Sequence, residues 1–587
     1  MTAKFRALKL PTLTTVPRAT ISLATISLAS VMLASCGGGG STNQSTPPPT
    51  VVTPPPPVAT GPTWTQGVFE PESRFVARCE NPRSGTDPST ITNQNPNGSP
   101  FADREGSFLE EKFWQRSWSN RTYLWYDEIT DIDPITAIDP ETQLVYDRLG
   151  YFGQLKTMET TASGADKDRF HFTQDTAARF ERVSTGSSAG YGGQYAFLET
   201  RPPRDVRIAF TEADSPFAEA NVQRGAKILE IDGVDAVNGG TQADVDTLNA
   251  ALFPSELGET HTFVFEDSPG AEPRTVTVTS ATVISDPVLS SSVIEEGDDK
   301  VGYVVFNTFG TSTAERRLFE TFTDLAEADV DDLVLDLRYN GGGFLDIASQ
   351  LGYMIAGDKS EGQTFETLQF NDKFPTRNPV TNELIRPTPF FSETLGFSLN
   401  AGTDLPTLDL DRVFILSTSG TCSASEAVIN SLRGIDVEVI LVGDTTCGKP
   451  FGFYTTDNCG VSYSTIQFQG VNAKGFGDFG DGFSPGTTGM TVSGELVQGC
   501  VIPDDYSAQL GDTEEAMLQG ALTFQSTGEC PIQSTAQAKG IPDSQQRSFG
   551  DAAGLSITDS PIYQLEMSYR ETMIRDTPPS IIGQGAN

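Results

Sequence analysis

The chain has 587 residues and a formal net charge of −39 at pH 7, with 37% hydrophobic and 20% charged residues. This apolar content suffices for several folded domains. A surface this acidic repels phosphate backbones, and no basic patch stands out along the sequence, so nucleic-acid binding is excluded.

The N-terminus has the pattern of a secretory signal. Residues 1–18 are basic without an acid, and residues 19–35 are uncharged and mostly apolar. The tetrapeptide LASC that ends at Cys36 resembles a bacterial lipobox, which implies cleavage before Cys36 and lipidation of that cysteine. An ordinary signal peptide is the alternative. We therefore expect a protein of the bacterial cell envelope, lipid-anchored and facing the periplasm. Gly37 stands where aspartate often accompanies inner-membrane retention, which mildly favours the outer membrane.

Composition and periodicity divide the rest of the chain into five segments. An uncharged Gly- and Pro-rich tether leads into a mainly helical N-terminal domain, a β-rich domain, an α/β domain and a polar C-terminal extension. In the α/β domain, strand and helix patterns alternate, which argues for a layered sheet with crossovers. After a signal peptide at 1–35, we place the five segments at 36–68, 69–183, 184–285, 286–505 and 506–587.

Six cysteines remain after Cys36, and an even number in an oxidising compartment indicates three disulfides whose pairing the sequence leaves open. They lack the spacing of a structural zinc site. The run at 475–480 matches GxGxxG but opens no helix, which argues against a nucleotide site. The sequence therefore predicts neither a metal nor another cofactor.

The strongest candidate for a reactive group is Ser423. It lies in the run SGTCSASE, between a strand expected at 413–417 and a helix expected just after it. At a helix N-terminus, free N–H groups and the helix dipole favour the negative charge of an alkoxide and an oxyanion. Serine is also a common N-cap, and the pattern alone does not separate the two roles.

Two other serines, Ser188 and Ser484, match the pattern GxSxG. A nucleophile elbow is followed by an aspartate and then a histidine. No histidine follows Ser484, and only His261, inside a strand pattern, follows Ser188, so we expect both serines to lie in turns.

A serine nucleophile needs a base. The chain has only two histidines, His171 and His261, both outside the α/β segment, which argues against a Ser-His-Asp triad. Lysine can replace histidine when burial lowers its pKa from ~10.4 toward neutrality. Lys449 follows a strand pattern at 437–443, and strand–helix–strand geometry should return it to the sheet edge where Ser423 lies.

Three runs occur in the order DLRYNGGG (336–343), SASE (423–426) and VGDTTCGK (442–449). In this order they resemble the motifs of the carboxy-terminal processing, or tail-specific, serine peptidases. The resemblance covers about 104–525, and it includes the runs YLWYDEI and KDRFHFT near its start.

This resemblance implies Ser423 as nucleophile and Lys449 as general base. It also implies an oxyanion hole made by the N–H groups of Ala424 and of a glycine in 341–343, with Gly342 favoured because only glycine lets the backbone approach a substrate carbonyl closely. The implied fold of the catalytic domain is crotonase-like α/β.

Residues 215–233, from SPFAE to GAKILEIDG, resemble the most recognisable part of a PDZ domain. The loop Gly190-Tyr191-Gly192-Gly193 then stands where such a domain binds a peptide's C-terminal carboxylate while the peptide adds as a strand. A module that only packs against its neighbour is the alternative. The expected architecture is therefore a crotonase-like catalytic domain with a β-rich PDZ domain and a helical N-terminal domain.

The sequence departs from the family at one catalytic neighbour. Many members carry glutamine four residues after the lysine, whereas this chain has Phe453, and Gln467 is a candidate to orient Lys449 instead. Cysteines also flank the expected site. A disulfide from Cys422 to Cys447 would link the segments that carry Ser423 and Lys449, and a disulfide from Cys447 to Cys459 is equally allowed.

The function expected from the sequence is a lipoprotein endopeptidase that captures polypeptide C-termini and cleaves through an acyl-enzyme. A non-catalytic adaptor that binds peptides in the same grooves is the alternative, and Phe453 is the feature that favours it.

Overall fold

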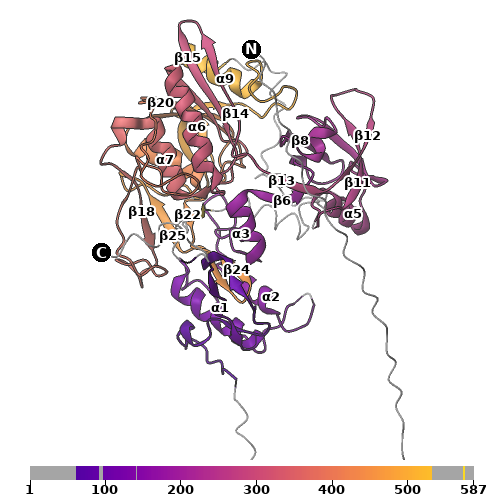
Figure 1. Ribbon diagram of the computed structural model, residues 1–587, viewed down its shortest axis with the longest axis vertical. Helices are drawn as coiled ribbons and strands as arrows, with labels where there is room; N and C mark the ends of the chain where they lie inside the picture. The colour runs from indigo at the N-terminus through magenta and orange to yellow at the C-terminus, as the bar shows by residue number, and fades with distance from the viewer. Residues whose placement is uncertain are drawn as a thin grey trace, which may run out of the picture. The chain divides into compact units, whose positions relative to one another are not determined.

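The computed structural model describes the backbone of 573–574 and residues 61–90, 95, 97–140, 142–254 and 256–531 (Figure 1). The signal peptide, the lipidation candidate Cys36 and most of the tether lie outside the described residues. Among the helices that are described, none is both long enough and apolar enough to cross a membrane.

A seven-stranded sheet forms the centre of the α/β segment, in the order β14-β15-β16-β20-β21-β27-β26. Its strands pair in parallel except for the β14–β15 hairpin. Apolar runs such as RVFILS in β20 suit strands buried on both faces. The strands span Val288–Glu296 (β14), Asp299–Phe306 (β15), Asp332–Asp336 (β16), Arg412–Ser417 (β20), Glu438–Gly443 (β21), Phe483–Gly486 (β26) and Glu495–Val501 (β27).

Helices cover both faces of this sheet and close two apolar cores. On one face, α6 presents Leu318, Phe322 and Leu325, which recur at helical spacing and are buried beside α7 and α8. On the other face lies α9. The helices span Thr313–Ala328 (α6), Leu345–Ala356 (α7), Ala424–Gly434 (α8) and Ala516–Thr527 (α9). The predicted mixed α/β fold is confirmed.

Shorter strands extend this body toward the N-terminal segment. One small sheet has the order β19-β18-β25-β22, and another has the order β23-β24-β5. These elements and a 3₁₀ turn span Phe172–Asp175 (β5), Gly343–Phe344 (β17), Gly357–Ser360 (η3), Thr364–Phe370 (β18), Thr388–Pro389 (β19), Phe451–Gly452 (β22), Thr456–Asn458 (β23), Val461–Ser464 (β24) and Phe468–Val471 (β25).

The C-terminal segment is part of the α/β body as far as 531. Arg338, which is fully buried beside the sheet, donates to the carboxylates of Asp504 (2.6 Å) and Glu515 (2.9 Å). A buried guanidinium needs such partners, because an unpaired charge away from water costs several kcal/mol, about 3–5 when one partner is removed. A disulfide between Cys500 and Cys530 closes the same region. The predicted boundary at 505 therefore cuts through a packed unit.

The β-rich segment has an apolar core of its own. Its sheet runs β12-β11-β9-β8-β7, with β10 paired to β9. The helix expected at 242–253 is α5, Gln242–Leu252, which begins with a capping box between Thr241 and Asp244. The other elements are Gly193–Glu199 (β7), Asp205–Thr211 (β8), Pro216–Glu219 (α4), Lys227–Ile231 (β9), Val234–Asp235 (β10), Thr260–Glu266 (β11) and Arg274–Thr279 (β12).

The two GxSxG runs are strands, so the prediction that they form turns is wrong. Ser188 lies in β6 (Ser187–Gly190), which pairs with β13 (Ala281–Ile284), and Ser484 lies in β26. Small residues such as Gly and Ser have low strand propensity, but pairing with a distant strand overrides it.

The N-terminal segment shares its core with the α/β segment. Trp114 and Trp118 pack edge-on against Tyr463 of β24, with ring centroids 5.1 and 6.4 Å apart. Figure 1 accordingly shows β24, in orange, among the indigo helices of this segment. Between its helices the segment consists of turns and short strands: Glu72–Arg74 (η1), Arg78–Cys79 (β1), Thr86–Asp87 (β2), Pro88–Thr90 (η2), Ser99–Pro100 (β3), Arg104–Glu105 (β4), Phe108–Thr122 (α1), Arg148–Gly153 (α2) and Thr176–Thr185 (α3).

His171 sits in this shared core and predicts a pH-dependent stability. Its ring donates from Nε2 to Phe152 O and accepts at Nδ1 from Thr465 Oγ1, both at 2.9 Å, and burial lowers its pKa to about 4. The folded state therefore binds the ring's proton more weakly than the unfolded state, whose pKa is about 6.5. Stability should fall by about 3 kcal/mol as the pH drops from about 6.5 to about 4.

Urea unfolding at pH 7 and pH 4 measures this loss. His171→Gln keeps an amide donor for Phe152 O but does not titrate, so its stability should fall less over the same interval. Equal losses in the parent and in the variant would contradict the assignment.

Candidate active site

Ser423 is the N-cap residue of α8, at the end of the turn that follows β20. It is fully buried and has φ +64° and ψ −113°. A non-glycine residue in this conformation is strained, and such residues concentrate at functional sites. Among the described residues its Oγ has no hydrogen-bond partner. The hydroxyl is therefore not used as a helix cap.

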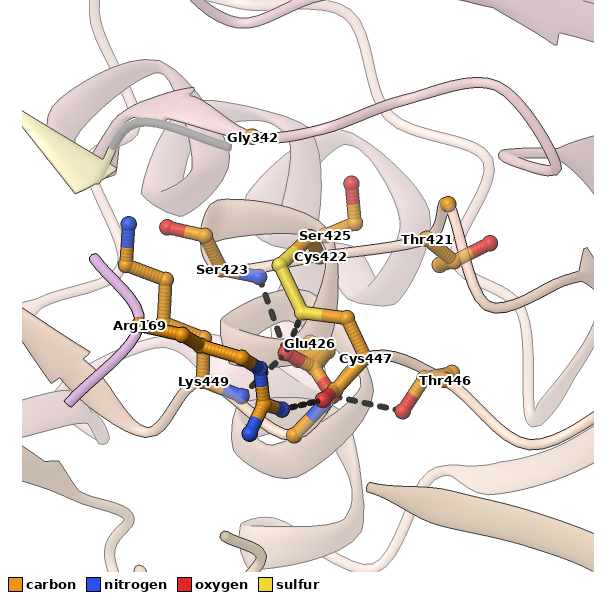
Figure 2. The surroundings of a disulfide bond; sticks show 12 residues. Arg169, Gly342, Thr421, Cys422, Ser423, Ser425, Glu426, Thr446, Cys447 and Lys449 are labelled. Carbon is orange, nitrogen blue, oxygen red and sulfur yellow. Dashed lines mark hydrogen bonds between the residues drawn. A yellow bond between two sulfur atoms is a disulfide. The ribbon is translucent and has the colours of Figure 1, made fainter. Parts of the chain in front are cut away.

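Lys449 lies beside this serine. β20 and β21 are neighbouring parallel strands, so the segments that follow them meet at one edge of the sheet. Lys449 is fully buried, and in Figure 2 its amino end and the Ser423 hydroxyl point toward one another. The Nζ atom lies 4.4 Å from the ring centroid of Phe170 and 5.0 Å from that of Phe453. The structure thus brings the two residues singled out from the sequence into one buried site.

The carboxylate of Glu426 holds together the segments that carry Ser423 and Lys449. Its Oε2 accepts from the N–H groups of Ser423 (2.9 Å) and Lys449 (2.8 Å), and its Oε1 accepts from Gly448 N–H (2.8 Å) and the Thr446 hydroxyl (2.5 Å; Figure 2). Burial raises the pKa of Glu426 above its ordinary value, and these donors oppose that shift because they stabilise the carboxylate. Glu426 is therefore a positioning residue that joins the serine turn to the lysine loop.

Glu426→Gln should destabilise the protein by about 3 kcal/mol, because the new NH₂ group faces N–H donors and leaves two of them without an acceptor in the interior. The peptide hydrolysis expected from the sequence should fall with it, since the serine turn and the lysine loop lose a shared anchor. Urea unfolding and hydrolysis rates check the two effects. Glu438→Gln, at the exposed start of β21, removes the same charge and should change neither. A fully stable Glu426→Gln would contradict the anchoring role.

A disulfide also joins the two segments. Cys422, directly before Ser423, is bonded to Cys447, two residues before Lys449. The Cys447 N–H donates to Thr421 O (3.0 Å), and the Arg169 guanidinium donates to Cys447 O. Of the pairings left open by the sequence, Cys422–Cys447 is therefore realised. Cys459 pairs instead with Cys79.

Gly342 lies against the serine from the other side. A Cβ built on Gly342 (φ +105°) would come within 2.7 Å of Ser423 Cβ and 3.0 Å of Ala424 N, so only glycine fits here. Its N–H donates to Asn340 Oδ1 (2.9 Å). Asn340 O accepts from Cys422 N–H (3.0 Å), so Asn340 ties the glycine loop to the serine turn. The N–H of Ala424 occupies the first helical position, where N–H groups lack an intrahelical acceptor.

The position that many family members give to glutamine is occupied by the buried ring of Phe453. Gln467, the residue considered as its substitute, is also buried, and its Oε1 accepts from Tyr454 N–H (2.9 Å). The side-chain oxygen of Gln467 thus binds the backbone of the segment between β22 and β23.

The glycine-rich loop of the β-rich segment borders the same region. One pocket is lined by Gly190–Tyr195 and by the end of α5 on one side, and by Asn307 and Gly341 on the other. Packing also requires glycine in this loop: a Cβ at Gly192 (φ +82°) would lie 2.1 Å from Ser215 Cβ, and one at Gly193 would lie 2.6 Å from the Phe217 ring. Tyr191 is buried against Phe217 and Phe263.

Three contributors to the site were missed by the sequence reasoning: Asn340, Arg169 and Phe170. Asn340 lies inside the run DLRYNGGG, and the other two lie inside KDRFHFT, so their motifs were recognised but their contacts were not. The histidines take no part in it: His171 bonds to Phe152 and Thr465, and His261 bonds to Asp232 (2.5 Å).

Comparison with known proteins agrees with this geometry. The chain is 27% identical over 294 residues to a carboxyl-terminal-processing protease of Picosynechococcus sp., covering 49% of this chain and 62% of that protein. It is 25% identical over 308 residues to a chloroplastic C-terminal processing peptidase of Tetradesmus obliquus, covering 50% and 58%. It thus spans about 60% of the length of the curated relatives that it matches.

A crystal structure from Bacteroides fragilis, described as an S41 protease, shares the fold with a TM-score of 0.51. It is 22% identical and is aligned over 71% of this chain and 97% of that chain. Residues 300–457 match the sequence model of Peptidase family S41. The chain therefore contains a region that matches peptidase family S41, and about half of the chain is similar to carboxyl-terminal-processing proteases.

Proposed function

We propose that the protein is a serine endopeptidase that cleaves polypeptides through an acyl-enzyme formed on Ser423, with Lys449 as the general base. The observation that carries this proposal is the buried pair itself: a strained serine whose hydroxyl is not used for capping, facing a lysine that aromatic rings shield from water. Removing an ammonium from water costs free energy, so burial favours the neutral amine that a base needs.

In the acylation step, Ser423 Oγ attacks the carbonyl carbon of the scissile peptide bond while its proton moves to Lys449 Nζ. The carbonyl oxygen becomes an oxyanion. When the C–N bond breaks, Lys449 returns the proton to the leaving amine. Water then attacks the ester, with Lys449 again accepting a proton, and the new carboxyl terminus leaves as Ser423 is restored.

The oxyanion would be held by the N–H of Ala424 and by that of Gly342. The first is at the N-terminus of α8, where N–H groups lack an intrahelical acceptor, and the helix dipole adds favourable potential there. The second donates to Asn340 Oδ1 in this structure, so it must share or leave that bond when the oxyanion forms.

The finer architecture belongs to the same proposal: a crotonase-like catalytic domain and a PDZ domain that engages substrate C-termini. What supports it is the pocket that runs from the loop Gly190–Gly193 to Gly341, next to Gly342. A peptide added as a strand beside β7 would place its terminal carboxylate at that loop. We further propose that Cys36 is lipidated, so that the enzyme is membrane-anchored and faces the periplasm.

A specific observation keeps the non-catalytic adaptor as the second candidate. Phe453 replaces the glutamine that many relatives use to orient the lysine, so Lys449 could be held unproductively.

The test uses protein that starts at residue 61, incubated with a largely unfolded protein that has an apolar C-terminus, and reads the products by intact mass. Cleavage by the parent and none by Ser423→Ala, with both folded by circular dichroism, is the expected result. A free C-terminus should be preferred to an amidated one. Peptide binding without turnover in the parent would instead support the adaptor.

A further inference from the structure

The chain's own C-terminal segment reaches the catalytic loop. Met573–Ile574 form a strand, β28, whose backbone pairs in parallel with β17, Gly343 opposite Met573 and Phe344 opposite Ile574. β17 begins directly after Gly342, the glycine that lies against Ser423. In Figure 2 the pale yellow arrow of β28 lies at the upper left, on the same side of Ser423 as Gly342.

The opposite side of β28 faces the lysine loop. β28 also lies against β22, Phe451–Gly452, which begins two residues after Lys449. β17 already uses its other edge, because Phe344 N–H donates to Phe309 O (3.0 Å) and Phe309 bridges Gly343. The C-terminal strand therefore occupies the remaining edge of β17, between the oxyanion glycine and the segment of the base. We call this space, between β17 and β22 beside Ser423, the substrate cleft.

A polypeptide substrate must place its scissile carbonyl in the same space. An extended backbone binds an exposed strand edge through main-chain hydrogen bonds, largely independently of its sequence. A strand paired to β17 passes next to Gly342 and thus next to the Ser423 hydroxyl. Two strands cannot pair with the same edge of β17 at once.

We propose that the C-terminal segment around Met573–Ile574 is an intramolecular ligand of the substrate cleft that competes with external polypeptides. This inference rests on the proposed function, because it takes the cleft to be the one that binds substrates.

The covalent link makes weak pairing effective. About 40 residues separate Pro531, the last residue of the described body, from Met573. Linking a ligand covalently to its site gives an effective concentration on the order of 1 mM, and the cost of closing the loop grows only slowly with the number of linking residues. The pairing of two residues can therefore compete with substrates at low concentration. A substrate that also binds the β-rich segment can displace β28 from β17.

Amide hydrogen exchange measures the pairing without any need for activity. The chain from residue 61 to 587 would carry Ser423→Ala, which prevents self-cleavage, and would be compared with the same chain carrying Met573→Pro and Ile574→Pro. Proline has no N–H and breaks strand pairing. Amides in peptides covering 340–348 should exchange at least ~10-fold faster in the proline variant. Ser544→Pro with Gln545→Pro, a matched change elsewhere in the segment, should leave them unchanged.

Equal exchange in the two chains would overturn the pairing. Protection that rises with protein concentration would also overturn it, because the ligand would then be the tail of a second copy. With Ser423 intact, the proline pair at 573–574 should raise kcat/KM for the unfolded substrate at least threefold, through a lower KM, relative to the Ser544–Gln545 control.

If amide exchange becomes faster but KM does not change, the C-terminal strand does not compete with substrates. The proposed peptidase activity would be unaffected by that result. If no chain hydrolyses the substrate, the proposed function fails, and the exchange experiment still decides whether the tail binds.

Discussion

Replacing Lys449 with methionine is expected to lower peptide hydrolysis by about 10⁴-fold or more, because the serine loses its base and the leaving amine loses its proton donor. Methionine keeps a long apolar stem among Phe170 and Phe453, so the buried site should stay packed. Initial rates on the unfolded substrate, with unfolding curves for both proteins, give the measurement.

Lys474→Met is the matched control, since this lysine is half exposed and pairs with Asp436 at the surface. It should retain the parent rate. A folded Lys449→Met that hydrolyses within tenfold of the parent would remove Lys449 from the mechanism. Ser423 would then need another base.

The second large effect is expected at Gly342. Gly342→Ala introduces a Cβ 2.7 Å from Ser423 Cβ and 3.0 Å from Ala424 N, in the space that an oxyanion would need. The loop must move or the cleft must close. Since the loss of one oxyanion donor costs ~10²–10³ in kcat, we expect a fall of at least that size. Steady-state kinetics separate it from an effect on KM.

Gly297→Ala controls for the backbone. Gly297 also has a positive φ (+67°), but its Cβ would meet nothing within 4 Å. It should cost some stability and leave kcat near that of the parent. If both alanine variants lose kcat equally, general backbone strain, and not the position of Gly342, explains the loss.

The parts of the site that the sequence predicted are those with local signals. Ser423 stands between a buried strand pattern and an amphipathic helix, and Lys449 follows the next strand, so chain order alone places them at one sheet edge. The helices around them also follow from apolar spacing and caps, as α5 and α6 do. Local apolar patterns and turn residues therefore sufficed to predict the order of the elements and the meeting of Ser423 and Lys449 at one sheet edge.

What the sequence could not predict depends on contacts between distant segments. Phe170 and Arg169 reach the site because β5 pairs with β24, a register that no local pattern specifies. The same pairing merges the N-terminal segment with the α/β body and shifts the domain boundaries that composition suggested. A buried ion pair with Arg338 likewise draws Glu515 into the core from a stretch that looks like a polar tail.

The pairing of the cysteines also could not be predicted from the sequence. Six cysteines in an oxidising compartment predict bridges, but their partners depend on Cα distances, such as 5.1 Å between Cys422 and Cys447, that only the folded chain provides. The role of Asn340 in joining the glycine loop to the serine turn could not be predicted for a similar reason. Its side chain accepts from Gly342 N–H, whereas its backbone oxygen accepts from Cys422 N–H in a distant segment.

Rapid acid quenching would trap the acyl-enzyme proposed to form on Ser423. The enzyme would be mixed with the unfolded substrate, quenched within milliseconds to seconds, digested and analysed by mass spectrometry. A substrate-derived acyl group is expected on the peptide that contains Ser423 and should be absent from Ser423→Ala. Hydrolysis that proceeds without this adduct and survives Ser423→Ala would contradict the proposed acyl-enzyme.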